Sequence, residues 1–293
     1  MQFGKSILKG VKWTSISTVG VALASLVRIS ILTRFLNKED FGLMAIVVFV
    51  LGVLNLFTDM GLTSAIFHKQ DISRKEYASL YWVNLFFGIS LYGFIFFLSP
   101  HIASFYKEPQ LTELILLMAI SIVFAGLGNQ YKTIEQKNLN FKLIAIVEVI
   151  SSSLALVLAI ILAVKGFGIY ALVFSALLQY SLPNLVFFLR GIVIRPVLFY
   201  FNWTLVHPFL KIGIFEVGSQ VVNYFNRDLD IIIIGKLFST EILGGYSLAK
   251  QLVYRPAQVI NPIITKIANP LLAKFQDNIN ILKINYLKLI KII

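Results

Sequence analysis

The sequence predicts an all-α integral membrane protein, a polytopic bundle of helices that cross the bilayer several times. Two observations lead to this fold class. Hydrophobic residues make up 58% of the chain and charged residues only 14%, whereas soluble domains are about 45 to 50% apolar and about 25% charged. The apolar residues also form runs far longer than a barrel strand and without period-two alternation, so helices are favoured over a closed β-barrel.

Eight apolar runs reach the length of about 20 residues that a helix needs to cross the hydrocarbon core. They predict spans at residues 13–33, 41–66, 80–100, 112–131, 143–164, 169–190, 208–234 and 242–264. The first run follows lysines and lacks a small-residue cleavage site, so we expect a retained span rather than a removed signal peptide. The loops are short, the longest being residues 191–207, and we expect no soluble catalytic domain in them.

The basic residues are distributed unevenly over the loops of this chain, whose formal net charge is +12. Counted from loop to loop, fifteen lysines and arginines fall on the side of the N-terminal tail and five on the other side: Arg34, Lys38, Lys107, Lys165 and Lys236. Cytoplasmic loops carry such an excess, so we expect a cytoplasmic N-terminus. The charge then reflects topology, and no nucleic-acid partner is expected.

Two stretches of the chain are similar to each other. Residues 28–42 align without a gap to residues 230–244, an offset of 202, and four pairs are identical: Ile29/Ile231, Ile31/Ile233, Glu39/Glu241 and Gly42/Gly244. Each copy ends one apolar run, crosses a charged turn and begins the next. The spans that end in the two copies both run outward from the cytoplasmic side. This shared direction predicts parallel repeats related by an axis along the membrane normal.

This repeat predicts a division into two lobes. We expect an N-terminal lobe at residues 1–195 with six spans, and a second lobe at residues 196–293 with two spans and the start of a third. The loop 191–207 has an aromatic and polar composition that suits the membrane interface and forms the expected boundary. Because the second lobe has fewer spans than the first, the chain is expected to be a fragment of a longer protein.

Polar side chains within the spans are sparse, and an ionisable one costs about 2.5–3.5 kcal/mol at the centre of a span on insertion scales. The span 208–234 carries a stripe at three- and four-residue spacing, which predicts a face that meets water or protein. The stripe consists of Asn223, Asn226, Arg227 and Asp230. Arg227 and Asp230 could also simply neutralise each other. Lys250 and Arg255 have no acidic neighbour in their own helix, and unpaired cations are expected where an anion binds.

Short motifs along the whole chain carry a resemblance to a known family. They are Phe41-Gly42, Asp59-Met-Gly-Leu62, Lys69-Gln-Asp-Ile-Ser73, Tyr81-Trp-Val-Asn84, Gly166-Phe-Gly-Ile-Tyr-Ala-Leu-Val173, Asp230-Ile-Ile-Ile-Ile-Gly235 and Gly244-Gly-Tyr-Ser-Leu-Ala249. The chain resembles the polysaccharide flippases of the MOP exporter superfamily, and most nearly the O-antigen and colanic-acid-type exporters. The resemblance implies a two-lobed bundle of twelve to fourteen spans, more than this chain holds.

The resemblance also implies a function. Such a flippase carries an undecaprenyl-diphosphate-linked oligosaccharide from the cytoplasmic to the periplasmic leaflet of the bacterial inner membrane by alternating access. The expected partners are this lipid-linked substrate, membrane lipids, and the polysaccharide polymerase and glycosyltransferases of the same pathway. No cofactor and no enzymatic activity are expected.

Physical chemistry suggests which residues would serve that function. A diphosphate is anionic, so a central cavity needs cations, and the available set is Arg28, Arg227, Lys250 and Arg255, with Arg227 and Arg255 preferred. The candidates for coupling to a proton or sodium ion, or for holding the cations in place, are Asp59, Glu148 and Asp230. Arg28 could instead extend to the outer interface, and Asp59 could join two helices by a hydrogen bond. The repeat places Arg28 opposite Asp230 across the lobe seam.

Other functions remain open at this point. A lipid II or multidrug exporter of the same superfamily is one alternative, although the basic character of the last two spans disfavours cationic drugs. An integral-membrane polysaccharide-synthesis enzyme or a structural membrane component are others. The chain has no cysteine, and its three histidines, His68, His101 and His207, lie far apart at span ends. This spacing does not match a metal site.

Overall fold

The computed structural model describes residues 2–58, 61–69, 71–273, 283 and 286–287. Its regular elements in these ranges are helices, with no strand among them. The helices are α1 (Gln2–Leu32), α2 (Lys38–Thr58), α3 (Leu62–His68), α4 (Arg74–Tyr106), α5 (Gln110–Lys137), α6 (Phe141–Val164), α7 (Ile169–Ile194), α8 (Trp203–Leu237) and α9 (Thr240–Ala273). The predicted all-α fold class is confirmed.

Seven helices in the described part of the chain are long and apolar enough to cross a membrane: α1, α2, α4, α5, α6, α7 and α8. They correspond to the first seven predicted spans, so the protein is a multi-pass membrane protein. The eighth predicted span lies inside α9, which is helical over 34 residues but is not one of the seven. Polar residues along α9, Lys250, Gln251 and Arg255 among them, lower its hydropathy.

The prediction of one span over residues 41–66 was wrong, because α2 ends at Thr58 and a separate helix, α3, begins at Leu62. Gly61 lies between them with a φ of +68°, a left-handed conformation that glycine adopts without steric cost. A side chain at Gly61 would also collide with α8, since its Cβ would lie 2.3 Å from the Cα of Gly213. Asp59 lies outside the described residues, so its predicted role stays a prediction.

The start of α4 lies six residues before the predicted span. Ser73 caps the helix: its side chain accepts a hydrogen bond from the N–H of Glu76, and the Glu76 carboxylate accepts one from the N–H of Ser73. This capping box satisfies two backbone donors that a helix start leaves free. With 33 residues, α4 is about 50 Å long at 1.5 Å per residue, so it extends beyond a hydrocarbon core of about 30 Å.

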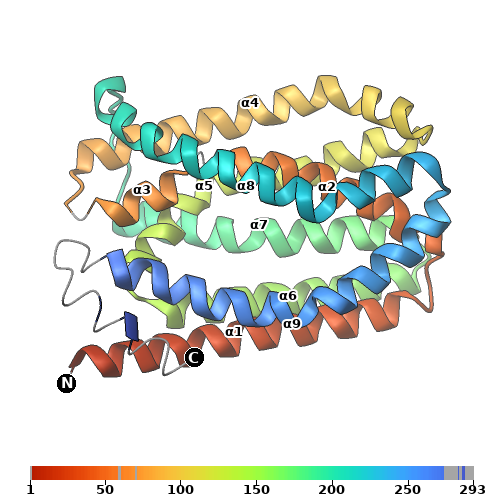
Figure 1. The fold of residues 1–293 in the computed structure, drawn as a ribbon, viewed down its shortest axis with the longest axis horizontal. Helices are drawn as coiled ribbons and strands as arrows, with labels where there is room; N and C mark the ends of the chain where they lie inside the picture. Colours follow the sequence, from red (N-terminus) through yellow and green to blue (C-terminus); the bar gives the residue numbers. More distant parts are fainter. Residues whose placement is uncertain (1, 59–60, 70, 274–282, 284–285, 288–293) are drawn as a thin grey trace.

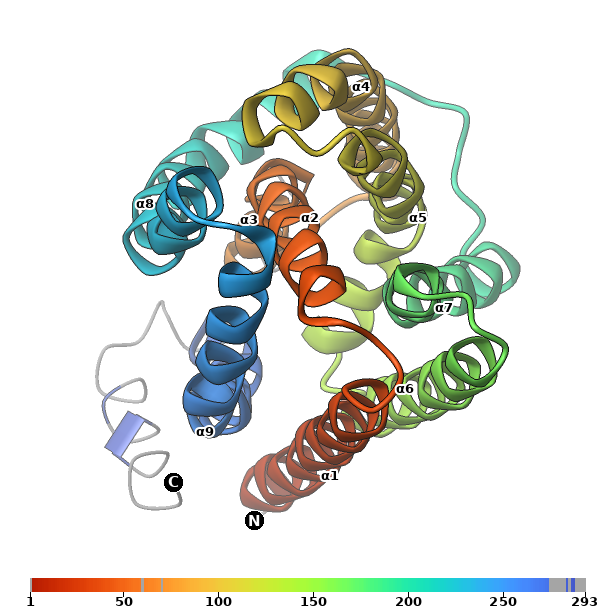
Figure 2. The same cartoon turned by 90° about the vertical axis from the view of Figure 1, so that its right-hand side faces the viewer.

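The long helices run side by side along the long axis of the molecule (Figure 1). Seen end-on, they form a ring in which α6, α7, α5 and α4 follow one another from α1, while α8 and α9 close the other side (Figure 2). Helix α2 lies inside this ring and contacts α4, α5, α7, α8 and α9. Buried residues accordingly make up 61% of the apolar stretch of α2 but only 22% of that of α4.

The two copies of the sequence repeat meet where α2 crosses α9. A Cβ on Gly42 would lie 1.9 Å from the carbonyl oxygen of Thr240, and a Cβ on Gly244 would lie 1.8 Å from that of Lys38. Thr240 and Gly244 are the equivalents of Lys38 and Gly42 at the offset of 202 residues. The glycine of each copy therefore packs against the same backbone carbonyl position in the other copy. Such reciprocity is typical of elements related by a two-fold axis.

Candidate functional site

A cavity of about 360 Å³ opens inside the bundle between α1, α5, α6, α7 and α9. Its polar lining includes Lys132, Glu148, Gln179, Tyr180, Asn184 and Arg255. Arg255 and Tyr180 lie near the middle of their helices, whereas Lys132 is five residues from the end of α5. The cavity therefore extends from mid-bundle toward the end where α1 begins, on the left in Figure 1.

Arg255 is the charged group of this cavity that lacks a partner. Its Nε is buried without a hydrogen-bond acceptor, and no carboxylate within the described ranges forms an ion pair with its guanidinium. A buried donor of a charged group that stays unpaired is costly. An anionic group entering the cavity would supply the missing acceptor.

Arg28 of α1 lies close to this position. It is half-buried and interacts electrostatically with Tyr180 and with Arg255. The structure gives Arg28 no carboxylate partner among the residues it describes. Two neighbouring guanidinium groups repel each other, and an anion between them would reverse the sign of that interaction. Arg28, Arg255 and Tyr180 together are called the arginine pair site below.

Glu148, a predicted charge-balancing residue, lines the same cavity. Its Oε1 lies 3.0 Å from Nζ of Lys132, and it accepts a short hydrogen bond from the hydroxyl of Ser17 in α1. Sequence reasoning missed Lys132 because it was assigned to a loop, while α5 in fact continues to Lys137. Glu148 itself indicated such a partner, because an acidic side chain within a span usually pairs with a cation.

The two other predicted cations are already neutralised in a network between α8 and α9. Arg227 Nη2 lies 2.7 Å from Asp228 Oδ2, so its partner is Asp228 and not Asp230, which the sequence offered as an alternative partner. Lys250 Nζ lies 3.0 Å from Asp228 Oδ1 and 2.6 Å from Asp230 Oδ1. The hydroxyl of Tyr246 donates a short hydrogen bond to the carboxylate of Asp230. With two cations and two carboxylates, this network has no net charge.

The network changes the ranking of the candidate residues. Lys250 has no acidic neighbour in its own helix, as predicted, but α8 supplies two. Arg28 was predicted to lie opposite Asp230; the described residues show no ion pair between the two, and Arg28 interacts electrostatically with Arg255. Asp228 was not a candidate from the sequence, although its side chain is the one that joins Arg227 to Lys250. The structure thus leaves Arg28 and Arg255 as the cations without an acidic partner in the predicted set.

Comparison with known proteins places the chain among proteins of polysaccharide biosynthesis. A family described as "Polysaccharide biosynthesis protein" matches residues 31–293. The chain is 28% identical over 299 aligned residues to the lipopolysaccharide biosynthesis protein WzxC of Escherichia coli K12, and 30% identical over 289 residues to the teichuronic acid biosynthesis protein TuaB of Bacillus subtilis 168. These alignments cover 100% and 99% of this chain, respectively.

A further relative is the succinoglycan biosynthesis transport protein ExoT of Rhizobium meliloti, 26% identical over 87% of this chain and 51% of its own length. The chain spans 60% of the length of WzxC and of TuaB. No solved structure matches the chain.

Proposed function

The chain belongs to the polysaccharide biosynthesis protein family, and from this membership we propose that it moves a lipid-linked oligosaccharide across the membrane for polysaccharide export. The names of its relatives refer to lipopolysaccharide, teichuronic acid and succinoglycan, and one of them is called a transport protein. A multi-pass bundle with an internal polar cavity is suited to carrying a polar group through an apolar layer.

The proposed cargo is an oligosaccharide on undecaprenyl diphosphate, carried from the cytoplasmic to the outer leaflet of the bacterial inner membrane by alternating access. The observation that carries this proposal is the arginine pair site. Arg255 and Arg28 lack acidic partners among the described residues. Arg255 lines the cavity, and Arg28 interacts electrostatically with Arg255 and Tyr180 of its lining. Guanidinium groups bind phosphate oxygens in a bidentate manner. The two arginines would bind the diphosphate, which makes them transport residues rather than catalytic ones.

The carboxylates have supporting roles in this proposal. Glu148 holds Lys132 at the cavity wall, so protonation of Glu148 would free a third cation to attract the cargo. Asp230 holds Lys250 in the α8–α9 network. Both remain candidates for coupling to a proton or sodium ion, as does Asp59. The polymerase and glycosyltransferases of the same pathway are the proposed protein partners.

The proposal is tested by genetic complementation in the host of this protein. The gene is deleted and supplied again on a plasmid, and surface polysaccharide is measured together with the membrane abundance of the protein. Arg255→Gln should lower surface polysaccharide at least about tenfold, the effect of losing roughly 1.4 kcal/mol of binding in the transport step. Arg255→Lys should retain part of the activity because the charge remains.

The matched control is Arg34→Gln, which removes an exposed arginine from the turn between α1 and α2. Surface polysaccharide should be unchanged in this variant. Full complementation by the double variant Arg28→Gln/Arg255→Gln would show that the arginine pair site does not bind the cargo, and lipid-linked oligosaccharide that fails to accumulate in the deletion strain would contradict transport itself.

A further inference from the structure

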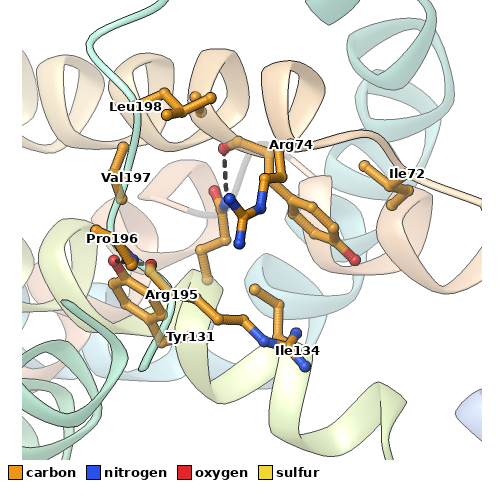
Figure 3. Close-up of a pocket in the computed structure, with 11 residues that line it drawn as sticks. Ile72, Arg74, Tyr131, Ile134, Arg195, Pro196, Val197 and Leu198 are labelled. Atoms are coloured by element: carbon orange, nitrogen blue, oxygen red, sulfur yellow. Dashed lines mark hydrogen bonds between the residues drawn. The ribbon is translucent and has the colours of Figure 1, made fainter. Parts of the chain in front are cut away.

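A second pocket lies between the start of α4, the end of α5 and the segment that joins α7 to α8 (Figure 3). Its volume is about 220 Å³, and it shares no lining residue with the cavity of the arginine pair site. Its lining residues come from three segments, within 72–78, 130–134 and 195–198. We call it the α4–α5 pocket.

Two arginines from distant parts of the sequence line this pocket, Arg74 at the start of α4 and Arg195 after the end of α7. Neither forms an ion pair with a carboxylate in the described ranges. The nearby Glu76 is already occupied, because it binds Lys69 and caps α4. The positive end of the α4 dipole adds to the charge of the two arginines.

The backbone around the two arginines is held in place. Arg74 is the first residue of α4 and directly follows the N-cap residue Ser73. The N–H of Arg195 donates to the carbonyl of Gly191 at 2.7 Å, and its own carbonyl accepts from the hydroxyl of Tyr131 at 3.5 Å. Both residues are exposed, and their ordered backbone brings the two side chains to the lining of one small pocket.

Neutral polar groups complete the lining. The amide nitrogen of Gln130 donates to the carbonyl of Tyr77 at 2.8 Å, which leaves its Oε1 as a free acceptor. This oxygen is buried without a partner, in a side chain that belongs to a residue only 6% exposed. The hydroxyl of Tyr77 likewise has no hydrogen bond within the described part of the chain. The pocket therefore offers cationic donors, a hydroxyl donor and an acceptor.

The surroundings of the pocket are those of a membrane interface. Its apolar wall consists of Ile72, Ile134, Val197 and Leu198. The segment beside it exposes Val193 and Phe199, at 80% and 96% of their surface. Trp82 donates its indole N–H to the carbonyl of Leu198 at 3.0 Å, and tryptophan is enriched at the level of lipid headgroups.

We propose that the α4–α5 pocket binds the headgroup of an anionic glycerophospholipid that carries a hydroxyl group, such as phosphatidylglycerol. Arg74 and Arg195 bind the phosphodiester, and Tyr77 donates to a phosphate oxygen. Gln130 accepts from a hydroxyl of the head, while the acyl chains lie along the exposed apolar side chains near Phe199. The volume suits one phosphate with a glycerol group and is too small for an oligosaccharide.

Lipid binding to the detergent-purified protein, measured by native mass spectrometry, tests this site. The probes are dioleoyl phosphatidylglycerol, dioleoyl phosphatidylethanol, which has the same charge and no head hydroxyl, and zwitterionic dioleoyl phosphatidylcholine. Phosphatidylglycerol should bind most tightly. Arg74→Gln/Arg195→Gln should weaken its binding at least about tenfold, whereas Gln130→Met should mainly abolish the preference for phosphatidylglycerol over phosphatidylethanol. Circular dichroism and thermal denaturation confirm that each variant is folded.

Arg34→Gln is the control, since it removes one exposed arginine at the opposite end of the bundle and should bind lipid as the original chain does. Equal binding of phosphatidylglycerol by the double variant, or equal binding of phosphatidylcholine and phosphatidylglycerol by the original chain, would overturn the proposal. Displacement of bound phosphatidylglycerol by equimolar undecaprenyl diphosphate would assign the pocket to the cargo lipid instead. Because the readout is equilibrium binding, it does not depend on whether the chain transports an oligosaccharide.

Discussion

At the scale of single residues, whether an arginine is available to bind an anion depends more on the side chains around it than on its position in the sequence. Arg227 lies in α8 and Arg255 in α9, two neighbouring helices in the C-terminal half of the chain. Asp228 binds the guanidinium of Arg227 at 2.7 Å, whereas Arg255 keeps a buried nitrogen without an acceptor. An anion stabilises a cation without a partner more than one that already has a carboxylate, so we propose that Arg255, and not Arg227, binds the diphosphate.

Asp228 is the residue on which the α8–α9 network depends. It is 8% exposed and binds both Arg227 and Lys250, so Asp228→Asn should lower the free energy of unfolding by about 2 kcal/mol. This is less than the roughly 3–5 kcal/mol for a buried charge left fully unpaired, because Lys250 retains Asp230. Thermal denaturation in detergent measures the loss as a lower Tm.

Arg227→Gln provides the comparison for Asp228→Asn. The side chain of Arg227 is 56% exposed, and exposed ion pairs contribute about 0–1 kcal/mol, so this variant should change Tm little. The double variant Asp228→Asn/Lys250→Gln should lower the free energy of unfolding by less than the sum of the decreases in the two single variants, because it removes the cation together with its partner. A Tm of Asp228→Asn equal to that of the original chain would contradict a structural role for the network.

Pairings between helices are the part of the candidate site that the sequence could not supply. Spacing along one helix suggested Arg227 with Asp230, because three-residue spacing puts side chains on one face. The actual partner of Asp230 is Lys250, 20 residues away on the next helix. Which helix faces which depends on packing, and an isolated sequence pattern does not contain that information.

At the scale of elements, apolar run length predicted the helices well and their ends poorly. Spans of about 20 apolar residues are imposed by the thickness of the membrane, so seven of them appear where expected. The ends depend on local chemistry: a capping box begins α4 early, and a left-handed Gly61 separates α3 from α2. Neither feature interrupts the apolar run, so composition alone did not reveal the break at α3.

The crossing of α2 and α9 gives a prediction at this scale. Gly42→Ala and Gly244→Ala each place a methyl group within 2 Å of a backbone oxygen of the other helix, and backbone cannot move aside as a flexible side chain can. Each substitution should lower the free energy of unfolding by about 1–3 kcal/mol, as overpacking of a tight contact does. Denaturation of the purified protein in detergent measures it.

Gly245→Ala is the matched control on the same helix. A Cβ on Gly245 would meet no atom within 4 Å, and alanine is a better helix former than glycine by about 1 kcal/mol. This variant should therefore be as stable as the original chain or slightly more stable. If Gly42→Ala and Gly245→Ala had the same stability, the helices would not be in contact through these glycines.

At the scale of the whole molecule, the reciprocal glycine contact supports a two-lobe organisation. Equivalent positions 202 residues apart pack against each other, and Lys38 of one copy lies 3.7 Å from Glu241 of the other. We propose that the lobes are residues 1–195 and 196–293. Two lobes that meet at a glycine crossing could rock against each other there, which is the movement that alternating access requires.

The orientation of the bundle in the membrane is the last prediction, and the chain is well suited to its test because it contains no cysteine. Lys142 and Lys165 lie at opposite ends of α6, and both are exposed. If the excess of basic residues faces the cytoplasm, a membrane-impermeant maleimide should label Lys165→Cys in intact spheroplasts. It should label Lys142→Cys only after the membrane is permeabilised. The reverse pattern would place the N-terminus outside, and the opening of the arginine pair cavity would then face away from the side on which lipid-linked precursors are proposed to be loaded.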